Sequence, residues 1–350
     1  MAKGKTRIAI NGFGRIGRLF FRQAFDNENM EVVAINDLGD LANLTYLLKY
    51  DTVYRQFPGE VEMKAPSTTL GTGGSLIIDG KEIKYTQIKD AATLPWKDLN
   101  IDIVVESTGV FESYEKAKVH LDAGAKRVVI TAPAKDADGD MGKTILNGIN
   151  EKDFKVCKIS SNGSCTTNAA SPVIQILEES IGIEKAILST VHAYTATQSI
   201  VDSPTKGVDY RRGRAGAQNI SPSTTGAAIA VTRAIKSLAG KFDGIAIRVP
   251  VITGSIADIT FISKKKTTVE EINNIFKKAA KDPRWEGIFT TSSEQMVSSD
   301  IIGQPYGAIV DLNFTKVVDG NLVKVLSWYD NEMGYVQTLI DHVSKAGQNL

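Results

Sequence analysis

A cysteine and a histidine are the residues of this chain best suited to covalent chemistry. Cys165 follows a run of small polar residues and precedes an apolar helical pattern, which places it at or near a helix N-terminus. The helix dipole and the free backbone amides at such a position favour a thiolate. Buried structural cysteines are inert, so the alternative of a purely structural Cys165 stays open at this point.

His192 is the candidate base for this thiol. It ends the apolar strand predicted over residues 186–192, and strand ends are the usual place for site residues in α/β proteins. An imidazole near the thiol would lower the pKa of the thiol and later carry a proton. A strand-end histidine with a satisfied hydrogen bond is the open alternative. We expect His120 on a surface helix beside Lys118, and His342 in the C-terminal helix.

A second chemical site is predicted near the N-terminus. Gly12, Gly14 and Gly17 form a GxGxxG motif between a strand predicted over 7–11 and a helix predicted over 15–27. The first glycine permits a tight turn, the second lets amides approach a pyrophosphate, and the third lets helix and strand pack closely. The helix N-terminus attracts phosphates. The cofactor-binding loop predicted here also includes Phe13, Arg15 and Ile16.

An acidic residue at the end of the second strand indicates which dinucleotide binds. The strand predicted over 31–36 leads into Asn36 and Asp37, and Asp37 stands twenty residues beyond Gly17. A carboxylate there accepts hydrogen bonds from ribose hydroxyls and repels a 2′-phosphate, which favours NAD over NADP. A glycine turn that binds nothing is the alternative, and the complete order of strand, loop, helix, strand and acid argues against it.

Composition limits the class of protein. The chain has 350 residues, 42% of them apolar and 23% charged, with a formal net charge of +1. The length favours two domains, and the near-zero charge gives no global attraction for nucleic acid or membrane. Two cysteines at this spacing fit no zinc, redox or disulfide pattern, so we expect no metal site. No signal-peptide core and no apolar run near the ~20 residues of a membrane span is present, so we expect a cytoplasmic protein.

The elements that must position these residues follow from hydrophobic periodicity. Continuous apolar strands separated by helices predict a parallel sheet covered on both faces, with strands over 7–11, 31–36, 101–106 and 127–131 and a helix over 114–122. A helix over 171–180, with Pro172 near its start, then opens a different pattern. Longer alternating strands over 244–249, 255–263, 308–316 and 323–329 predict a mostly antiparallel sheet. The aperiodic segment 201–218 is typical of a functional loop.

These elements predict an α/β protein with two domains. Residues 1–163 would form a Rossmann-type, doubly wound parallel sheet that binds the dinucleotide, and the helix over 332–350 would return to it. Residues 164–331 would form a second, α+β catalytic domain on the mostly antiparallel sheet.

Eight motifs, in order along nearly the whole chain, resemble the glyceraldehyde-3-phosphate dehydrogenase family. They are Asn11–Arg18 (NGFGRIGR), Leu47–Asp51 (LLKYD), Val105–Gly109 (VESTG), Ser164–Asn168 (SCTTN), Thr190–His192 (TVH), Ser223–Ala228 (STTGAA), Arg248–Pro250 (RVP) and Ser327–Glu332 (SWYDNE). The resemblance implies a glycolytic, NAD-dependent enzyme that oxidises glyceraldehyde 3-phosphate. Cys165 would be the nucleophile and His192 the base, and inorganic phosphate would attack the resulting thioester.

The resemblance also implies the remaining site residues. The substrate phosphate would lie near Thr195, Thr197, Arg211 and Arg248, and the attacking phosphate near Ser164, Thr166, Thr225, Gly226 and the same Arg248. Arginine suits bidentate contact with phosphate, and Arg248 is flanked by apolar residues, so its charge needs a partner. Cofactor contacts would come from Thr108, Gly109, Asn331 and Tyr335, with Leu38 and Pro204 typical of NAD-specific members. The loop 201–218 resembles one that lines a neighbouring subunit's cofactor site in a homotetramer.

The chain departs from the family pattern at a few positions. Ala169 replaces a common second cysteine, residues 135–150 form a longer segment than usual, and the sequence over 304–307 is unusual. Two other functions stay open: an erythrose-4-phosphate dehydrogenase that works without phosphorolysis, and a non-catalytic nucleotide-binding or RNA-binding protein. The intact Cys165 and His192 and the near-neutral charge argue against the latter.

Overall fold

The computed structural model describes residues 4–65, 73–205 and 207–350. The chain divides into two compact units. The first unit comprises Met1–Ile145, Glu151–Asn162 and Leu339–Leu350, and the second comprises Leu146–Asn150 and Gly163–Thr338. Residues of the last helix, α7 (Met333–Gln348), belong to both units.

The first unit is built on a nine-stranded sheet in the order β10-β11-β9-β8-β1-β2-β7-β6-β5. The neighbours from β10 to β7 pair in parallel, and β6 and β5 add an antiparallel edge. The strands are β1 (Thr6–Asn11), β2 (Met30–Asn36), β5 (Val61–Lys64), β6 (Gly74–Ile78), β7 (Lys81–Thr86), β8 (Ile103–Glu106), β9 (Arg127–Ile130), β10 (Gly142–Thr144) and β11 (Ile159–Ser161), and β3 (Tyr50–Asp51) and β4 (Arg55–Gln56) form a separate pair. The predicted parallel sheet is confirmed.

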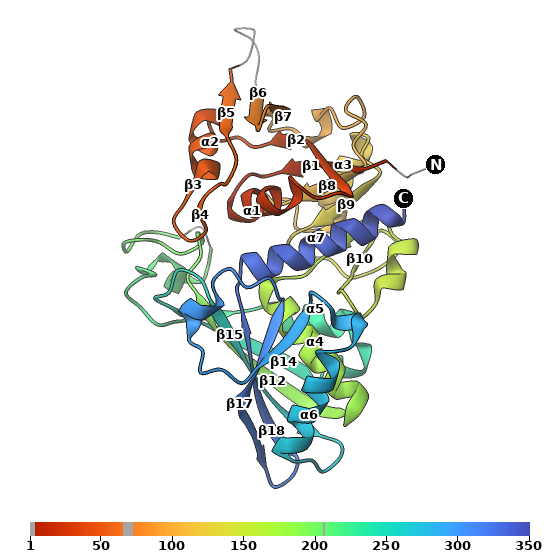
Figure 1. Cartoon of the computed structure of the whole chain (residues 1–350), viewed down its shortest axis with the longest axis vertical. Coiled ribbons are helices and arrows are strands. Elements are labelled where there is room, and N and C mark those ends of the chain that lie inside the picture. The colour runs from red at the N-terminus through yellow and green to blue at the C-terminus, as the bar shows by residue number, and fades with distance from the viewer. Residues whose placement is uncertain (1–3, 66–72, 206) are drawn as a thin grey trace. The chain divides into compact units, whose positions relative to one another are not determined.

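Three helices pack on this sheet: α1 (Arg15–Ala24), α2 (Leu41–Lys49) and α3 (Tyr114–Asp122) (Figure 1). The caps of two of these helices are visible in the sequence, because Asp40 and Ser113 accept hydrogen bonds from the first-turn amides of α2 and α3. One side of the sheet, with Ala9, Ala34 and Val104, forms a continuous apolar cluster with α3.

Four polar residues end four neighbouring strands at the same level. Glu106 of β8 pairs in register with Asn11 of β1, Asn11 with Asn36 of β2, and Asn36 with Thr86 of β7. All four side chains are buried. We call them the polar row. It marks the carboxyl edge of the sheet, where open α/β sheets bind ligands.

The second unit is built on a seven-stranded sheet in the order β13-β14-β12-β15-β18-β17-β16. Four of its six pairings are antiparallel, as predicted, and β12–β14 and β16–β17 are parallel. The strands are β12 (Ile183–Ala193), β13 (Ser221–Thr224), β14 (Phe242–Val249), β15 (Ser255–Ser263), β16 (Phe289–Ser292), β17 (Ala308–Val318) and β18 (Leu322–Tyr329). Helices α4 (Cys165–Ser180), α5 (Ala227–Ala234) and α6 (Val269–Ala279) lie on one face of this sheet (Figure 1).

Two local expectations need correction. Helix α4 begins at Cys165, so Pro172 lies in the helix interior and not near its start. The early start follows from a capping box, in which Ser164 and Thr167 exchange side-chain and backbone hydrogen bonds. His120 was expected on a surface helix, yet its side chain is fully buried. Within the described residues, no helix has the length and apolar character that crossing a membrane requires.

Candidate active site

The structure brings the predicted cysteine and histidine into contact. Cys165 is the first residue of α4, and His192 lies near the end of β12. The Sγ atom of Cys165 lies 3.3 Å from Nε2 of His192. Cys165 is partly exposed as a residue, and His192 is buried.

Arg248 is the cation beside this pair. β12 and β14 pair with His192 opposite Arg248. The Nη1 atom of Arg248 lies 2.6 Å from Nδ1 of His192, and the Ala193 carbonyl oxygen lies 2.7 Å from the same nitrogen. A guanidinium only donates and a carbonyl only accepts, so Nδ1 can form one of these two hydrogen bonds at a time. The choice sets whether Nε2, which faces the sulfur, accepts or donates.

The protonation state of the pair follows from its burial. Burial raises the pKa of the Cys165 thiol, and the Arg248 charge and the helix amides oppose this only in part. Burial and Arg248 lower the pKa of His192 to about 3. The resting pair is therefore a thiol beside a neutral imidazole, contrary to the thiolate expected from the helix terminus. A neutral imidazole at this distance is a competent acceptor for the thiol proton.

A buried tyrosine, Tyr329, contacts the residue next to Cys165 in α4 and the strand that carries His192. The hydroxyl of Tyr329 lies 2.9 Å from Oγ1 of Thr166 and 2.7 Å from Oγ1 of Thr190. The Tyr329 ring meets the His192 ring edge-on, with centroids 5.9 Å apart. Tyr329 thus connects the start of α4 to β12 and packs against the imidazole, and one hydrogen bond of the Thr166 hydroxyl goes to Tyr329.

Hydroxyl and arginine side chains gather near the end of β12. Oγ1 of Thr195 lies 2.9 Å from Oγ1 of Thr197, and Arg212 donates to Thr197 at 2.9 Å and to Ser223 at 3.0 Å. The predicted Arg211 instead forms an exposed ion pair with Asp209. Sequence reasoning missed Arg212, because both arginines lie in one short 3-10 helix, Tyr210–Gly213, and only the structure shows which one faces the threonines.

The other residues expected at the second phosphate site lie at helix starts. Ser164 caps α4, with its Oγ accepting from the Thr167 amide at 3.1 Å. Gly226 directly precedes α5, and Oγ1 of Thr225 accepts from the Ala227 amide at 3.2 Å. Helix N-termini present free amides to anions, which is compatible with the predicted role.

The glycine loop has the space that a dinucleotide needs. A Cβ atom on Gly12 would lie 2.6 Å from the Thr108 amide nitrogen, and one on Gly17 would lie 2.1 Å from the Gly12 carbonyl oxygen. Both positions therefore require glycine. A Cβ atom on Gly14 would meet nothing within 4 Å. The open position is the N-cap of α1, where a pyrophosphate would approach the helix amides, so the loop fits the cofactor.

A cleft of about 440 Å³ adjoins this loop, and its lining includes Gly12, Gly14, Asn36, Asp37, Leu38 and Thr108. Asp37 accepts hydrogen bonds from the Phe13 amide at 2.6 Å and from the Gly39 amide at 2.7 Å. Its carboxylate therefore stands at the mouth of the loop, where a ribose would lie.

Other predicted cofactor residues have structural partners. Arg15 forms an ion pair with Asp51, Ile16 is partly buried in α1, and Gly109 has a positive φ of 72° that suits glycine. In the second unit, Oδ1 of Asn331 accepts from the Gly254 amide at 3.1 Å and from Ser255 Oγ at 2.9 Å. This orientation leaves Nδ2 of Asn331 to donate. Tyr335 donates to the Gly163 carbonyl at 3.2 Å.

Comparison with known proteins identifies the family. A model of the glyceraldehyde 3-phosphate dehydrogenase C-terminal domain matches residues 164–331, and one of the NAD binding domain matches residues 6–114. The chain belongs to the glyceraldehyde-3-phosphate dehydrogenase family. A glyceraldehyde-3-phosphate dehydrogenase of Thermotoga maritima is 51% identical over 339 residues, which cover 96% of this chain and 97% of the relative. Those of Streptomyces coelicolor and Clostridium pasteurianum are each 44% identical, with 98% and 96% of this chain and 99% and 96% of the relatives covered.

The comparisons confirm three predictions made from the sequence. This glyceraldehyde-3-phosphate dehydrogenase family member has the expected Rossmann-type domain followed by a catalytic domain, it is an oxidoreductase, and its cofactor is NAD. The roles of single residues stay predictions, and the geometry above is what supports them.

Proposed function

We propose that this chain catalyses the phosphorylating oxidation of D-glyceraldehyde 3-phosphate to 1,3-bisphosphoglycerate, with NAD as oxidant. The observation that carries the proposal is the 3.3 Å contact between the Cys165 sulfur and Nε2 of His192, with Arg248 beside it. A nucleophile, a base and a phosphate-binding cation in one place are the parts that this reaction needs.

The reaction divides between the two side chains. The Cys165 sulfur attacks the aldehyde carbon while the thiol proton passes through Nε2 of His192 to the aldehyde oxygen, and the adduct is a thiohemiacetal. His192, neutral at rest, takes the proton of the adduct's hydroxyl at Nε2. NAD, when bound, would supply the oxidising chemistry as the hydride acceptor, and the product held on Cys165 would be a thioester. Inorganic phosphate then attacks the thioester carbon, the acyl phosphate leaves, and the sulfur regains its proton from His192.

Two arginine side chains that can bind the substrate phosphate and the attacking phosphate lie near the end of β12 in the second unit. Arg248 is partly buried next to the pair, and Arg212 donates hydrogen bonds to Thr197 and Ser223. We assign the substrate phosphate to Thr195, Thr197 and Arg248, and add Arg212 to the predicted set. The assignment of Arg211 stays a prediction, since in this structure its guanidinium pairs with Asp209.

A steady-state assay tests the proposal directly. NADH formation from glyceraldehyde 3-phosphate should require inorganic phosphate. The Cys165→Ser variant should lose turnover, by about 10⁴-fold or more, while its Kd for NAD stays near that of the wild type. Equal activity without phosphate, together with a preference for erythrose 4-phosphate, would establish the other dehydrogenase considered above. Full activity of Cys165→Ser would refute the mechanism.

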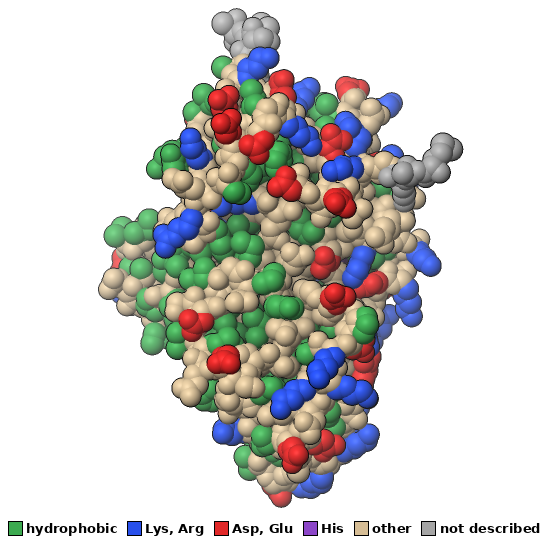
Figure 2. Space-filling view, viewed as in Figure 1, with side chains coloured by type: hydrophobic (Ala, Val, Ile, Leu, Met, Phe, Trp, Pro, Cys, Tyr) green, Lys and Arg blue, Asp and Glu red, His purple; other side chains and the backbone are tan. Residues whose placement is uncertain are grey.

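The loop after β12 supports assembly into a homotetramer. Apolar side chains of this loop and its flanks are widely exposed, among them Ile200, Val208 and Tyr210 at 89%, 93% and 77%. Hydrophobic side chains gather over the green loop region of Figure 1, as the space-filling view shows (Figure 2). Contiguous exposed apolar surface marks an interaction site, and these exposed side chains suit the covered position that the family resemblance implies. Sedimentation equilibrium would test the tetramer, and a monomer at micromolar concentration would exclude it.

A cytoplasmic location completes the proposal. The mechanism needs a reduced Cys165, and both cysteines of the chain are free thiols in the structure. Reducing compartments keep thiols in that state. Cell fractionation with an antibody against the protein would test the location.

A further inference from the structure

A fully buried carboxylate lies beneath the dinucleotide cleft and takes no part in the reaction above. Glu106 accepts hydrogen bonds from Nδ2 of Asn11 at 2.6 Å, from Nε2 of His120 at 2.9 Å and from the Thr108 amide at 2.8 Å. The Thr108 hydroxyl accepts from the Val110 amide at 3.0 Å, so its own hydrogen points to Glu106 as the fourth donor. Each carboxylate oxygen therefore faces two donors.

The direction of the contacts on the Asn11 side is set by a backbone amide. The Ile88 N–H can only donate, and it donates to Oδ1 of Asn36 at 2.9 Å. Nδ2 of Asn36 must then donate to Oδ1 of Asn11, at 2.8 Å. Nδ2 of Asn11 is left to donate to Glu106, so neither asparagine can turn its amide around.

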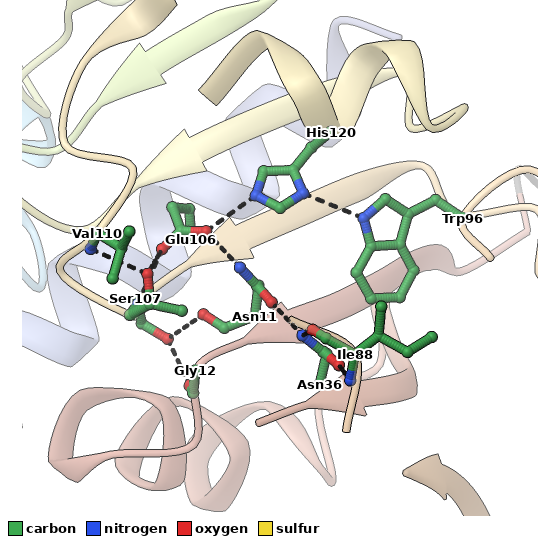
Figure 3. A network of polar contacts seen from close by, with 10 residues as sticks. Asn11, Gly12, Asn36, Ile88, Trp96, Glu106, Ser107, Val110 and His120 are labelled. Atoms are coloured by element: carbon green, nitrogen blue, oxygen red, sulfur yellow. Dashed lines mark hydrogen bonds and ion pairs between the residues drawn. The ribbon is translucent and has the colours of Figure 1, made fainter. Parts of the chain in front are cut away.

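The direction on the His120 side is set by an indole. Nε1 of Trp96 can only donate, and it lies 3.2 Å from Nδ1 of His120. Nδ1 therefore accepts, the ring proton sits on Nε2, and that proton points to Glu106. Figure 3 shows these two chains of contacts meeting at the one carboxylate.

The groups that converge on Glu106 line the cofactor cleft. Asn11, Asn36, Ile88, Thr108 and Val110 are among the residues of its lining. Glu106, His120 and Trp96 are themselves buried and reach the cleft through those neighbours. We propose that Glu106, oriented by His120 and Trp96, is a positioning residue that holds the floor of the cleft in the shape that binds NAD. The inference rests on the cofactor role assigned to this cleft.

Only a group that accepts at every position fits the network. A glutamine at position 106 would replace one carboxylate oxygen by an NH2 group, which only donates. If the NH2 group lay beside Thr108, it would face the Thr108 N–H, which has no other orientation. If it lay on the opposite side, it would face the donors of Asn11 and His120, whose directions are held by Ile88 and Trp96. A Glu106→Gln substitution is nearly isosteric, so it changes hydrogen bonding and leaves packing almost intact.

The test compares Glu106→Gln with a matched change elsewhere in the first unit. We expect Glu106→Gln to raise the Kd and KM for NAD by about tenfold or more, since unpaired buried donors distort the lining. The kcat at saturating NAD, and KM for aldehyde and for phosphate, should stay within about threefold of the wild type. The control is His342→Gln, because His342 is also fully buried and contacts Ser160 at 2.7 Å. The control should bind NAD as the wild type does. Equal NAD affinity in Glu106→Gln and the control overturns the proposal.

A second variant separates positioning from general stability. Trp96→Phe removes the indole donor, so the His120 ring can present an acceptor toward residue 106. Combined with Glu106→Gln, it should recover NAD affinity by about threefold relative to Glu106→Gln alone, whereas independent packing losses would add. Additive losses overturn the proposal. If Glu106→Gln does not fold, Trp96→Phe alone carries the test: a rise in KM for NAD by about threefold supports it, and an unchanged KM overturns it.

Failure of the inference and failure of the proposed function give different results. The wild type is first assayed for phosphate-dependent NADH formation and, separately, for NAD binding by calorimetry. A wild type that binds NAD without oxidising the aldehyde would refute the proposed reaction and leave the binding comparison of the variants valid.

Discussion

Replacing Asp37 by alanine should change which dinucleotide the protein prefers. The Asp37 carboxylate lines the cleft and is held by the Phe13 and Gly39 amides at 2.6 and 2.7 Å. In Asp37→Ala both amides lose their acceptor and point at the vacated space. The 2′-phosphate of NADP would then meet two N–H donors where it now meets a negative charge.

The magnitude follows from two contributions. Two unit charges 4 Å apart interact by about 4 kcal/mol at an effective dielectric constant of 20, and partial exposure of Asp37 reduces this to about 2 kcal/mol. NAD loses charge-assisted hydrogen bonds from its ribose, which cost about 1.5 kcal/mol. Together they shift the ratio of kcat/KM for NADP to that for NAD by about 3.5 kcal/mol, or two to three orders of magnitude.

The assay measures kcat/KM with both cofactors in the wild type, Asp37→Ala and a control. Asp40→Ala is the control, because Asp40 also accepts from a backbone amide, that of Asn43 at 2.9 Å, as the cap of α2. The control should keep the wild-type ratio of the two cofactors. An unchanged ratio in Asp37→Ala, with the protein folded by circular dichroism, would refute the reasoning and place cofactor specificity elsewhere.

Three further predictions follow from the geometry. Gly17→Ala should lower the melting temperature because its Cβ atom would meet the Gly12 carbonyl at 2.1 Å, whereas Gly14→Ala should keep the melting temperature and weaken NAD binding; equal effects on both measurements would contradict the assigned roles. Arg248→Leu should raise KM for aldehyde and for phosphate by about tenfold or more, and unaltered KM values would contradict its placement. Burial lowers the pKa of His342 to about 3, so the unfolded chain binds a proton that the folded chain does not between that pH and the ordinary value of 6.5. The contribution of this residue to the free energy of unfolding should therefore be fully present above pH 6.5. As the pH drops below 6.5, the free energy of unfolding should fall by up to about 1.4 kcal/mol per pH unit because of this residue. Urea titrations at several pH values would measure this, and the contribution should be absent from His342→Gln.

Local pattern was sufficient where a residue's role depends on its own segment. The GxGxxG loop, the position of Cys165 at or near a helix N-terminus and the alternation in β15 are local features that the structure has, although α4 begins at Cys165 and not at residue 171. The contact of Cys165 with His192 depends on the pairing of distant strands. It was expected from the family resemblance, since residue types alone left both side chains with structural alternatives.

Other features depended on partners far away in the chain. His120 looks exposed from its neighbours Lys118 and Asp122, which form a surface ion pair. It is buried because Glu106 and Trp96 approach it from other elements. The partners of His120 cannot be read from this one helix of nine residues, but its position on one helical face with Tyr114 and Ala117 is a signal of burial that the sequence contains.

The three histidines of the chain lie in three separate buried settings. His120 has both ring nitrogens in directed contacts, His192 has two competing partners at Nδ1, and His342 faces Ser160. Nitrogen-15 labelling of histidine alone would therefore give one spectroscopic reporter in each place. The tautomer of each ring could be recorded separately, and added phosphate that draws Arg248 away should move only the signals of the imidazole beside the sulfur.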